Sequence, residues 1–341
     1  VALVVDGEGG QVRQVQARLV GVEVGHRQLD RAEGGPQAVG VGRAGLVPDP
    51  QPQQQRAVLY IHGWSDLFHQ AHLAAEVESW GADFHALDLR RYGRNIVAGQ
   101  HSGWIDDLGE YDEEIDAAMG AILADHDSVT LMGHSTGGLI ASLWADRHPH
   151  TVDGLILNSP WLDMQGSAIT RSMISAASRT MCRADPDAVI RHSERDNFGR
   201  SIRRADGGEW DIPELKNPQD APFKVRAGWL AAIVSGQERV RAGLSIDVPV
   251  LCLMSARSDL STTWNEDMRH VDTVLDVERL ASAAVHLGAH VTVARIDGGL
   301  HDLVLSEEPV RAEVFEQMRT WRDAWVTPHS RTRAANHCKK D

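Results

Sequence analysis

One serine of this sequence lies on a stretch whose glycine spacing suits a reactive hydroxyl. The stretch LMGHSTGGLIASLWADRHP (131–149) has glycines two residues before and two residues after Ser135. An apolar run precedes the serine and a helical pattern follows it, which predicts a strand, a sharp turn and a helix. A nucleophile on such a turn has a strained backbone, so the flanking positions must lack a Cβ atom. The turn consists of Gly133, His134, Ser135, Thr136 and Gly137.

The alternative for this stretch is a glycine-rich turn with a capping serine, and five residues do not decide between the two. A serine hydroxyl is a poor nucleophile without a base, so a histidine is expected further along the chain. His301, in the segment RIDGGLHDLVLS, lies in the loop predicted after the last strand. A carboxylate must then orient the imidazole. The candidates after the preceding strand are Asp259, Asp272 and Asp276.

Stabilisation of a developing oxyanion requires two backbone N–H donors. The sharp turn would aim the amide of Thr136 at a substrate oxygen. His62 and Gly63 end an earlier predicted strand, and Trp64 follows them. We therefore expect the amides of Trp64 and Thr136 to form an oxyanion hole.

The elements that must position these residues alternate in type from residue 57 onward. Short apolar runs, typical of buried strands, are separated by helical patterns such as the one at 108–126. This alternation predicts a mostly parallel sheet that helices cover on both faces. The predicted strands are 57–62, 83–88, 128–133, 154–159, 249–254 and 290–296.

The alternation of predicted strands and helices stops between residues 161 and 246, where the sequence pattern is helical and charged residues occur in patches. Such an insertion is expected over the carboxyl edge of the sheet, where ligands of open α/β sheets bind. The period-two pattern at 11–24 predicts one or two antiparallel strands, and 34–56 predicts an exposed connection. The expected segments are 1–56 (N-terminal strands and connection), 57–160 (first part of the core), 161–246 (helical lid), 247–326 (second part of the core) and 327–341 (flexible tail).

Composition narrows the class of protein. The 341 residues include 34 basic and 48 acidic side chains, a net charge of −14, which argues against a nucleic-acid partner. Three cysteines without a CxxC pair do not make a disulfide framework and favour a reducing compartment. The sequence has no run of 18 apolar residues, which would be needed to predict a membrane-spanning helix, and no signal peptide is recognisable. A cytoplasmic location is therefore expected.

A metal site is not expected. His69 and His72 are three residues apart and are a conceivable zinc pair, but no HExxH motif or third ligand accompanies them. Structural or pocket-lining roles are more common for such histidines.

Together, the quoted residues resemble the α/β-hydrolase superfamily, in the serine-aminopeptidase-like branch that includes monoacylglycerol lipases and lysophospholipases. The resemblance covers about residues 57–325 and implies an α/β-hydrolase fold with a helical lid and no cofactor. In lipases of this branch the acid precedes a helix, which favours Asp272, 29 residues before His301. Asp259 is the second choice, and Asp276 is assigned to the helix start. The segments that carry the resemblance are YIHGWSD, ALDLRRYGRN, LMGHSTGGLIASLWA, LNSPWLD and GGLHDL.

The resemblance implies a serine hydrolase that cleaves a carboxylic ester, either a carboxylesterase or a lipase acting on monoacylglycerol or lysophospholipid. The catalytic residues would be Ser135, His301 and Asp272, working through an acyl-enzyme. Three alternative functions remain. The first is an aminopeptidase or amidase, which is favoured if acidic residues of SERDN or DGGEWD bind a free amine. The others are an acyltransferase and a non-enzymatic ligand-binding protein on the same fold.

Overall fold

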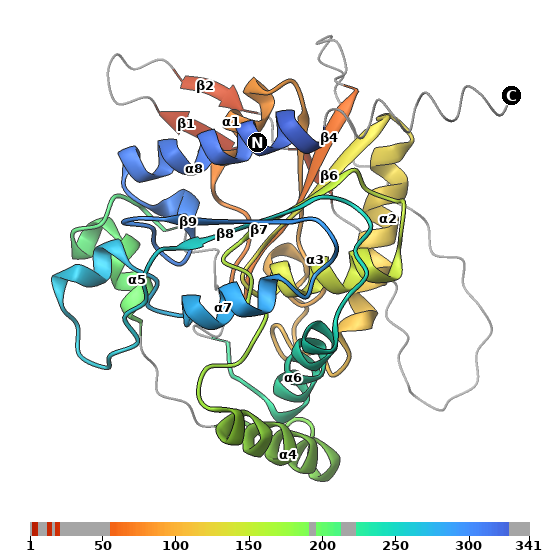
Figure 1. Ribbon diagram of the computed structural model, residues 1–341, viewed down its shortest axis with the longest axis vertical. Helices are drawn as coiled ribbons and strands as arrows, with labels where there is room; N and C mark the ends of the chain where they lie inside the picture. The colour runs from red at the N-terminus through yellow and green to blue at the C-terminus, as the bar shows by residue number, and fades with distance from the viewer. Residues whose placement is uncertain are drawn as a thin grey trace, which may run out of the picture.

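The core of the protein is a seven-stranded sheet in which every neighbouring pair of strands is parallel. The computed structural model describes residues 2–5, 12–15, 18–20, 55–190, 196–212 and 223–326. The strand order is β3-β5-β4-β6-β7-β8-β9 (Figure 1). The strands with an expected counterpart from residue 57 onward are β4 (Arg56–Ile61), β5 (Asp83–Leu87), β6 (Ser128–His134), β7 (Gly154–Asn158), β8 (Val250–Ser255) and β9 (Val291–Ile296).

The N-terminal strands agree with the sequence only in part. β1 (Ala2–Val5) and β2 (Val12–Val15) form an antiparallel pair; β2 lies within the period-two pattern at 11–24, whereas β1 lies outside it. The expectation is wrong for β3 (Arg18–Val20), which adds to the edge of the main sheet in parallel with β5. A parallel edge position gives β3 a ready-made row of backbone partners on β5. Residues 34–54 and 327–341 lie outside the described part of the chain.

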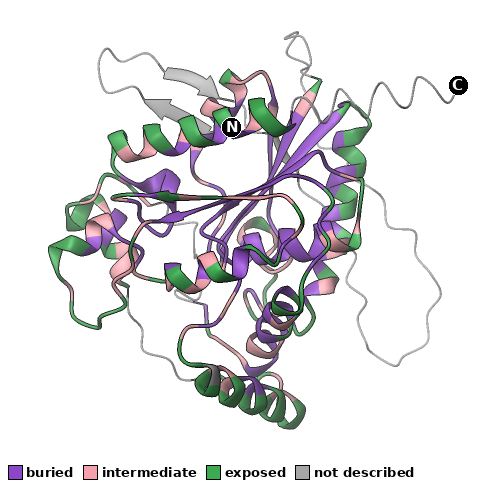
Figure 2. Cartoon of the chain, viewed as in Figure 1, coloured by how far each residue is buried: buried purple, intermediate pink, exposed green. Residues whose placement is uncertain are grey.

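Helices cover both faces of the sheet, and the alternation of side chains along β4 shows the two layers. Val58 and Tyr60 pack into the layer with α1 and α8, whereas Leu59 and Ile61 pack into the layer with α2, α3 and α7. Figure 2 shows the resulting continuous buried interior along the strands. The helices are α1 (Ala71–Ser79), α2 (Asp112–Leu123), α3 (Thr136–Arg147), α7 (Val277–Ala284) and α8 (Glu308–Trp321).

Between β7 and β8 the chain forms the expected helical segment. It contains α4 (Ala168–Ala184), α5 (Asn197–Ile202) and α6 (Ala227–Ala242). Gly236 brings α6 close to α3, because a Cβ atom there would lie 2.9 Å from Leu143 of α3. α4 lies outside α6, at the outer edge of the molecule (Figure 1). None of the described helices combines the length and the apolar character needed to cross a bilayer.

Parallel strands all end at the same edge of their sheet, and the candidate residues follow these ends. Ser135 comes directly after β6, and Asn158 is the last residue of β7. Asp272 and His301 lie in the connections that follow β8 and β9. The parallel sheet therefore gathers residues far apart in sequence at one edge.

Candidate active site

The turn that carries Ser135 has a strained backbone. Ser135 has φ of 51° and ψ of −118°, a conformation that residues with a Cβ atom rarely adopt. Its amide donates to the carbonyl of Asn158 at 3.1 Å, and its carbonyl accepts from the amide of Trp161 at 3.0 Å. These bonds tie the turn to the end of β7 and hold it in the strained conformation.

The flanking glycines allow the close approach that this turn needs. A Cβ atom on Gly133 would lie 2.6 Å from the carbonyl oxygen of Gly137, and one on Gly137 would lie 2.3 Å from that of His62. Both obstacles are backbone atoms, which cannot rotate away. Glycine is therefore required at both positions for a steric reason, as the sequence predicts.

Ser135, His301 and Asp272 are brought together in a buried line of hydrogen bonds. The His301 Nε2 atom lies 3.1 Å from the Ser135 Oγ atom, and the His301 Nδ1 atom lies 3.0 Å from an Asp272 carboxylate oxygen. A carboxylate only accepts, so Nδ1 carries a proton and the Nε2 lone pair of the neutral ring faces the serine hydroxyl. The three residues are 7%, 4% and 0% exposed, respectively.

Asp272 is fixed by its own loop. Its second carboxylate oxygen accepts from the amides of Val274 at 2.7 Å and Leu275 at 2.8 Å. Asp259, the second-choice acid, instead bonds Ser261 and the Asn265 side chain, which is 2.8 Å away. These hydrogen bonds, the one from the Ser261 hydroxyl foremost, lower the pKa of Asp259, but none of them involves His301.

The stretch between β8 and the acid forms a loop that closes on itself. The Asp272 amide donates to the carbonyl of Arg257 at 3.0 Å, and the Asp259 amide donates to that of Asp272 at 2.9 Å. This short ladder returns the chain to the sheet edge, so the extra residues do not displace the acid. Asp276 caps α7, its side chain accepting from the amides of Glu278 and Arg279, which confirms its assignment to the helix start.

Backbone N–H groups of the expected oxyanion hole border Ser135. Thr136 is the first residue of α3, where amides have no acceptor within the helix. The turn at Gly63 lies beside the serine, since a Cβ atom on Gly63 would be 3.2 Å from the Ser135 Cβ atom. The His62 Nδ1 atom donates to the Gly63 carbonyl at 2.9 Å. In a trans peptide the N–H points opposite to the C=O, so this bond also sets the direction of the Trp64 amide.

Three buried residues that sequence reasoning missed support the site. The Asp302 carboxylate accepts from the side-chain amides of Asn158 at 2.6 Å and Gln70 at 2.9 Å. The Asn158 side chain also accepts from the amide of Leu303 at 3.2 Å. The available signal was an asparagine ending an apolar strand and an acid directly after His301.

His134, beside the nucleophile, has a structural partner. Its Nδ1 atom donates to the carbonyl of Asn158 at 3.0 Å, and its ring centroid lies 5.0 Å from that of His301. Burial lowers the pKa of His134, which favours the neutral ring. The Asn158 carbonyl thus receives both the Ser135 amide and the His134 ring.

Aromatic side chains cover the carboxyl edge of the sheet. Phe198 of α5 contacts the His301 ring edge-on, with centroids 5.4 Å apart. The ring centroid of Trp64 lies 3.8 Å from the ring centroid of Trp229 of α6 and 5.6 Å from that of Phe223. Aromatic groups of the segment between β7 and β8 thus pack against His301 and Trp64.

His69 and His72, the conceivable zinc pair, contact different partners. His69 lies near Asp66 (3.7 Å), whereas the His72 Nε2 atom donates to the Val304 carbonyl at 2.7 Å. Among the described residues, one other group brings metal-ligand types together, at the opposite edge of the sheet: Asp83, His85 and His126. There the His126 Nε2 atom lies 3.0 Å from an Asp83 oxygen, and its Nδ1 atom donates to the Ile122 carbonyl. This is the geometry of a partly buried contact between an imidazole and a carboxylate.

Comparisons with known proteins agree with the fold. The sequence pattern of the serine aminopeptidase S33 family matches residues 52–308. Phospholipase YtpA of Bacillus subtilis is 26% identical over 276 residues, which cover 79% of this chain and 95% of that protein. A monoglyceride lipase homolog of Monkeypox virus is 23% identical over 73% of this chain and 82% of its own length.

Solved structures show the same fold. A monoacylglycerol lipase from Paleococcus ferrophilus superposes with a TM-score of 0.58 at 18% identity, over 81% of this chain and 96% of that one. A monoglyceride lipase variant from Saccharomyces cerevisiae, solved with a substrate analog, also gives 0.58, at 14% identity over 82% and 89%. The chain therefore belongs to the serine aminopeptidase S33 family of lipase- and esterase-like α/β-hydrolases.

Proposed function

We propose that this protein is a serine hydrolase that cleaves carboxylic esters through an acyl-enzyme on Ser135. The observation that carries the proposal is the buried line from the Ser135 hydroxyl through His301 to Asp272, with contacts of 3.1 and 3.0 Å. A serine held at positive φ, beside the amides of Trp64 and Thr136, adds the means to stabilise an oxyanion.

In the acylation step, His301 Nε2 takes the proton of the Ser135 hydroxyl while Oγ attacks the ester carbonyl. The negative charge that develops on the carbonyl oxygen is received by the Trp64 and Thr136 amides. His301 then gives its proton to the leaving alcohol as the carbon–oxygen bond breaks. Asp272 holds the protonated Nδ1 atom and stabilises the transient imidazolium.

In the deacylation step, water takes the place of the alcohol. His301 removes one proton from the water as its oxygen attacks the acyl carbon. The same two amides receive the oxyanion, and the proton returns to Ser135 as the acid leaves. No cofactor or metal ion is required for either step.

An aminopeptidase would need acidic side chains that are available to bind the free amine of its substrate. The candidate acids that the structure describes are already paired with arginines, which favours an ester as the substrate. Within the described residues of the two acidic segments, Asp196 and Asp206 are both paired with Arg203, Glu209 is paired with Arg311, and Asp211 with Arg204. Each carboxylate already has a cation. An amine would have to compete with a guanidinium group for each of them.

The class of ester follows from the cover of the site and from the relatives. Phe198, Trp64 and Trp229 offer an apolar surface that suits an acyl chain. The phospholipase and monoglyceride lipase relatives act on lipid-like substrates by name. We therefore propose monoacylglycerols or lysophospholipids as the substrate class, with simple carboxylic esters as minimal substrates.

The proposal is tested by reacting the protein with a fluorophosphonate probe and locating the adduct by mass spectrometry. The expected result is one adduct on Ser135 and hydrolysis of p-nitrophenyl esters, both abolished by Ser135→Ala. The dependence of the rate on acyl-chain length separates an esterase from a lipase. The same assay with an added alcohol detects acyl transfer as a new ester product. A folded protein without adduct or turnover would contradict the proposal and favour a ligand-binding role.

A further inference from the structure

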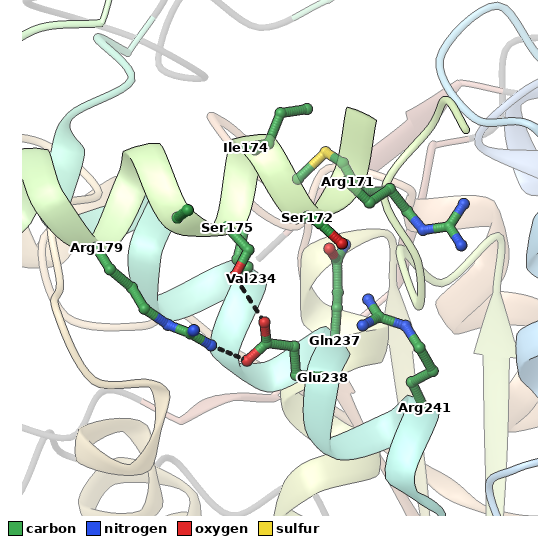
Figure 3. Close-up of a pocket in the computed structure, with 11 residues that line it drawn as sticks. Arg171, Ser172, Ile174, Ser175, Arg179, Val234, Gln237, Glu238 and Arg241 are labelled. Carbon is green, nitrogen blue, oxygen red and sulfur yellow. Dashed lines mark hydrogen bonds and ion pairs between the residues drawn. The ribbon is translucent and has the colours of Figure 1, made fainter. Parts of the chain in front are cut away.

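Helices α4 and α6 enclose a polar cavity of about 450 Å³ that the proposed mechanism does not use. It lies between these two helices, and Figure 3 shows side chains reaching into it from both. Its polar and charged lining residues are Arg171, Ser172, Ser175, Arg179, Gln237, Glu238 and Arg241.

Positive charge predominates in this cavity, although the chain as a whole has a net charge of −14. Arg171 and Arg241 face the same carboxylate, that of Asp163, at 3.6 and 3.3 Å. At the other end, Arg179 is paired with Glu238 (Figure 3). Three guanidinium groups are therefore balanced by two carboxylates.

The two arginines that share Asp163 keep unused donors. A guanidinium group has five N–H donors. In the described part of the chain, the Arg241 side chain has one hydrogen-bond acceptor, Asp163, and that of Arg171 has the Gly166 carbonyl at 2.8 Å. The Asp163 carboxylate balances one of these two guanidinium charges, and a bound anion would balance the other. The planar fork of arginine matches the oxygens of a phosphate group.

A buried amide next to these arginines adds a second requirement. Gln237 is 1% exposed, and its Nε2 atom donates to the carbonyl of Trp161 at 3.1 Å. Because that carbonyl only accepts, the contact fixes the other end of the amide as oxygen. Among the described residues the Gln237 Oε1 atom has no hydrogen-bond donor. A buried acceptor without a donor is costly, and a ligand hydroxyl would supply one.

We propose that the cavity between α4 and α6 binds a phosphate ester of a polyol, with the phosphate between Arg171 and Arg241 and a hydroxyl directed toward Gln237. The ligand is either a free compound of this kind or the glycerophosphate headgroup of a lysophospholipid. The site is a binding site, separate from the residues that carry out hydrolysis.

The test is calorimetric titration in phosphate-free buffer with glycerol 3-phosphate, inorganic phosphate and glycerol. We expect saturable binding of glycerol 3-phosphate at one site, weaker binding of phosphate and no binding of glycerol. Arg171→Gln and Arg241→Gln should each weaken glycerol 3-phosphate binding at least about tenfold, the value of one charge-assisted hydrogen bond. The matched control is Arg239→Gln, because Arg239 is also on α6 but pairs with Asp146 at 2.9 Å, outside the cavity.

Several results would overturn the proposal: no saturable binding to the wild-type protein, an equal loss in the Arg239→Gln control, or equal binding of glycerol. Equal affinity for phosphate and glycerol 3-phosphate would show that the ligand hydroxyl does not contribute to binding, and would contradict that part of the proposal. Thermal melts and fluorophosphonate labelling of each variant separate lost binding from lost folding.

A second arm identifies the source of the ligand. Binding of a lysophospholipid is measured below its critical micelle concentration on the Ser135→Ala variant, which keeps the ester intact. A loss of affinity with Arg241→Gln, absent for a monoacylglycerol of equal chain length, assigns the cavity to the lipid headgroup. Glycerol 3-phosphate binding without that selectivity assigns it to a free phosphate ester. Both binding measurements are independent of whether the protein hydrolyses esters.

Discussion

Asn158 and Asp302, which are 144 residues apart, are joined by a buried hydrogen bond of 2.6 Å. Asn158 ends β7 and receives the Ser135 amide on its carbonyl, while Asp302 directly follows His301. One residue thus connects the turn of the nucleophile to the loop of the base. We expect this connection to help set the distance between Ser135 and His301.

Replacing Asn158 with leucine should therefore lower activity without removing any reacting group. The side-chain bonds to Asp302 and Leu303 are lost, and the buried Asp302 loses one donor. Because a displacement of about 1 Å can cost about 10²-fold in rate, we expect kcat for a p-nitrophenyl ester to fall about 10- to 100-fold with KM nearly unchanged. The rate at which a fluorophosphonate probe labels Ser135 should fall by the same factor. A folded variant with wild-type kcat would show that the connection does not position His301.

Asp272→Asn and Asp259→Asn separate the two candidate acids. Asparagine at 272 keeps the shape but offers no full charge to the imidazolium, and it permits the wrong tautomer of His301. By analogy with other triads, kcat should fall by about 10⁴. Asp259→Asn should change kcat less than about threefold, because its bonds go to Ser261 and Asn265. A larger loss at 259 than at 272 would reverse the assignment.

Two Gly→Ala variants have opposite expected effects on stability. At Gly137 a Cβ atom would lie 2.3 Å from the His62 carbonyl oxygen, so we expect destabilisation of several kcal/mol, on the order of other large steric changes, or failure to fold. At Gly120, which is exposed in α2, a Cβ atom would meet nothing within 4 Å. There alanine should stabilise the protein by about 0.5–1 kcal/mol through its helix propensity. Urea unfolding of both variants gives the comparison.

The stability of the protein should fall on mild acidification partly because of His72. Burial lowers the pKa of His72 to about 4 from its ordinary 6.5, so between these values the unfolded chain binds a proton that the folded chain excludes. Stability is therefore full above pH 6.5 and is lost as the pH falls toward 4. Between pH 7 and pH 5 the loss from this group is at most about 2 kcal/mol.

His72→Gln tests this dependence, since glutamine also has an N–H for the Val304 carbonyl. The free energy of unfolding of this variant should decline about 2 kcal/mol less between pH 7 and pH 5 than that of the wild type. His286→Gln, at an exposed histidine, should keep the wild-type dependence. The same acid loss in all three proteins would exclude His72 as its source.

The sequence by itself determined the core strands and the turn of the nucleophile. Runs such as 154–157 are apolar on both faces, and their alternation with helical patterns is typical of a covered parallel sheet. The glycines around Ser135 are a local steric requirement, so they are visible in five consecutive residues. Parallel strands end at one edge, and this also predicts where His301 lies.

The tertiary structure decided those features of the fold and the site that depend on contacts between residues far apart in the sequence. The spacing after β8 left three aspartates open, and the backbone ladder between Arg257 and Asp272 selects which carboxylate meets His301. β3 pairs in parallel because β5 offers it an edge, which no local pattern encodes. The side-chain bonds that join Asn158 and Gln70 to Asp302 span more than 140 residues, and such contacts leave no periodicity in the sequence. Local sterics can be recognised from a short stretch of sequence, whereas hydrogen bonds between distant segments exist only once the sheet has brought those segments together.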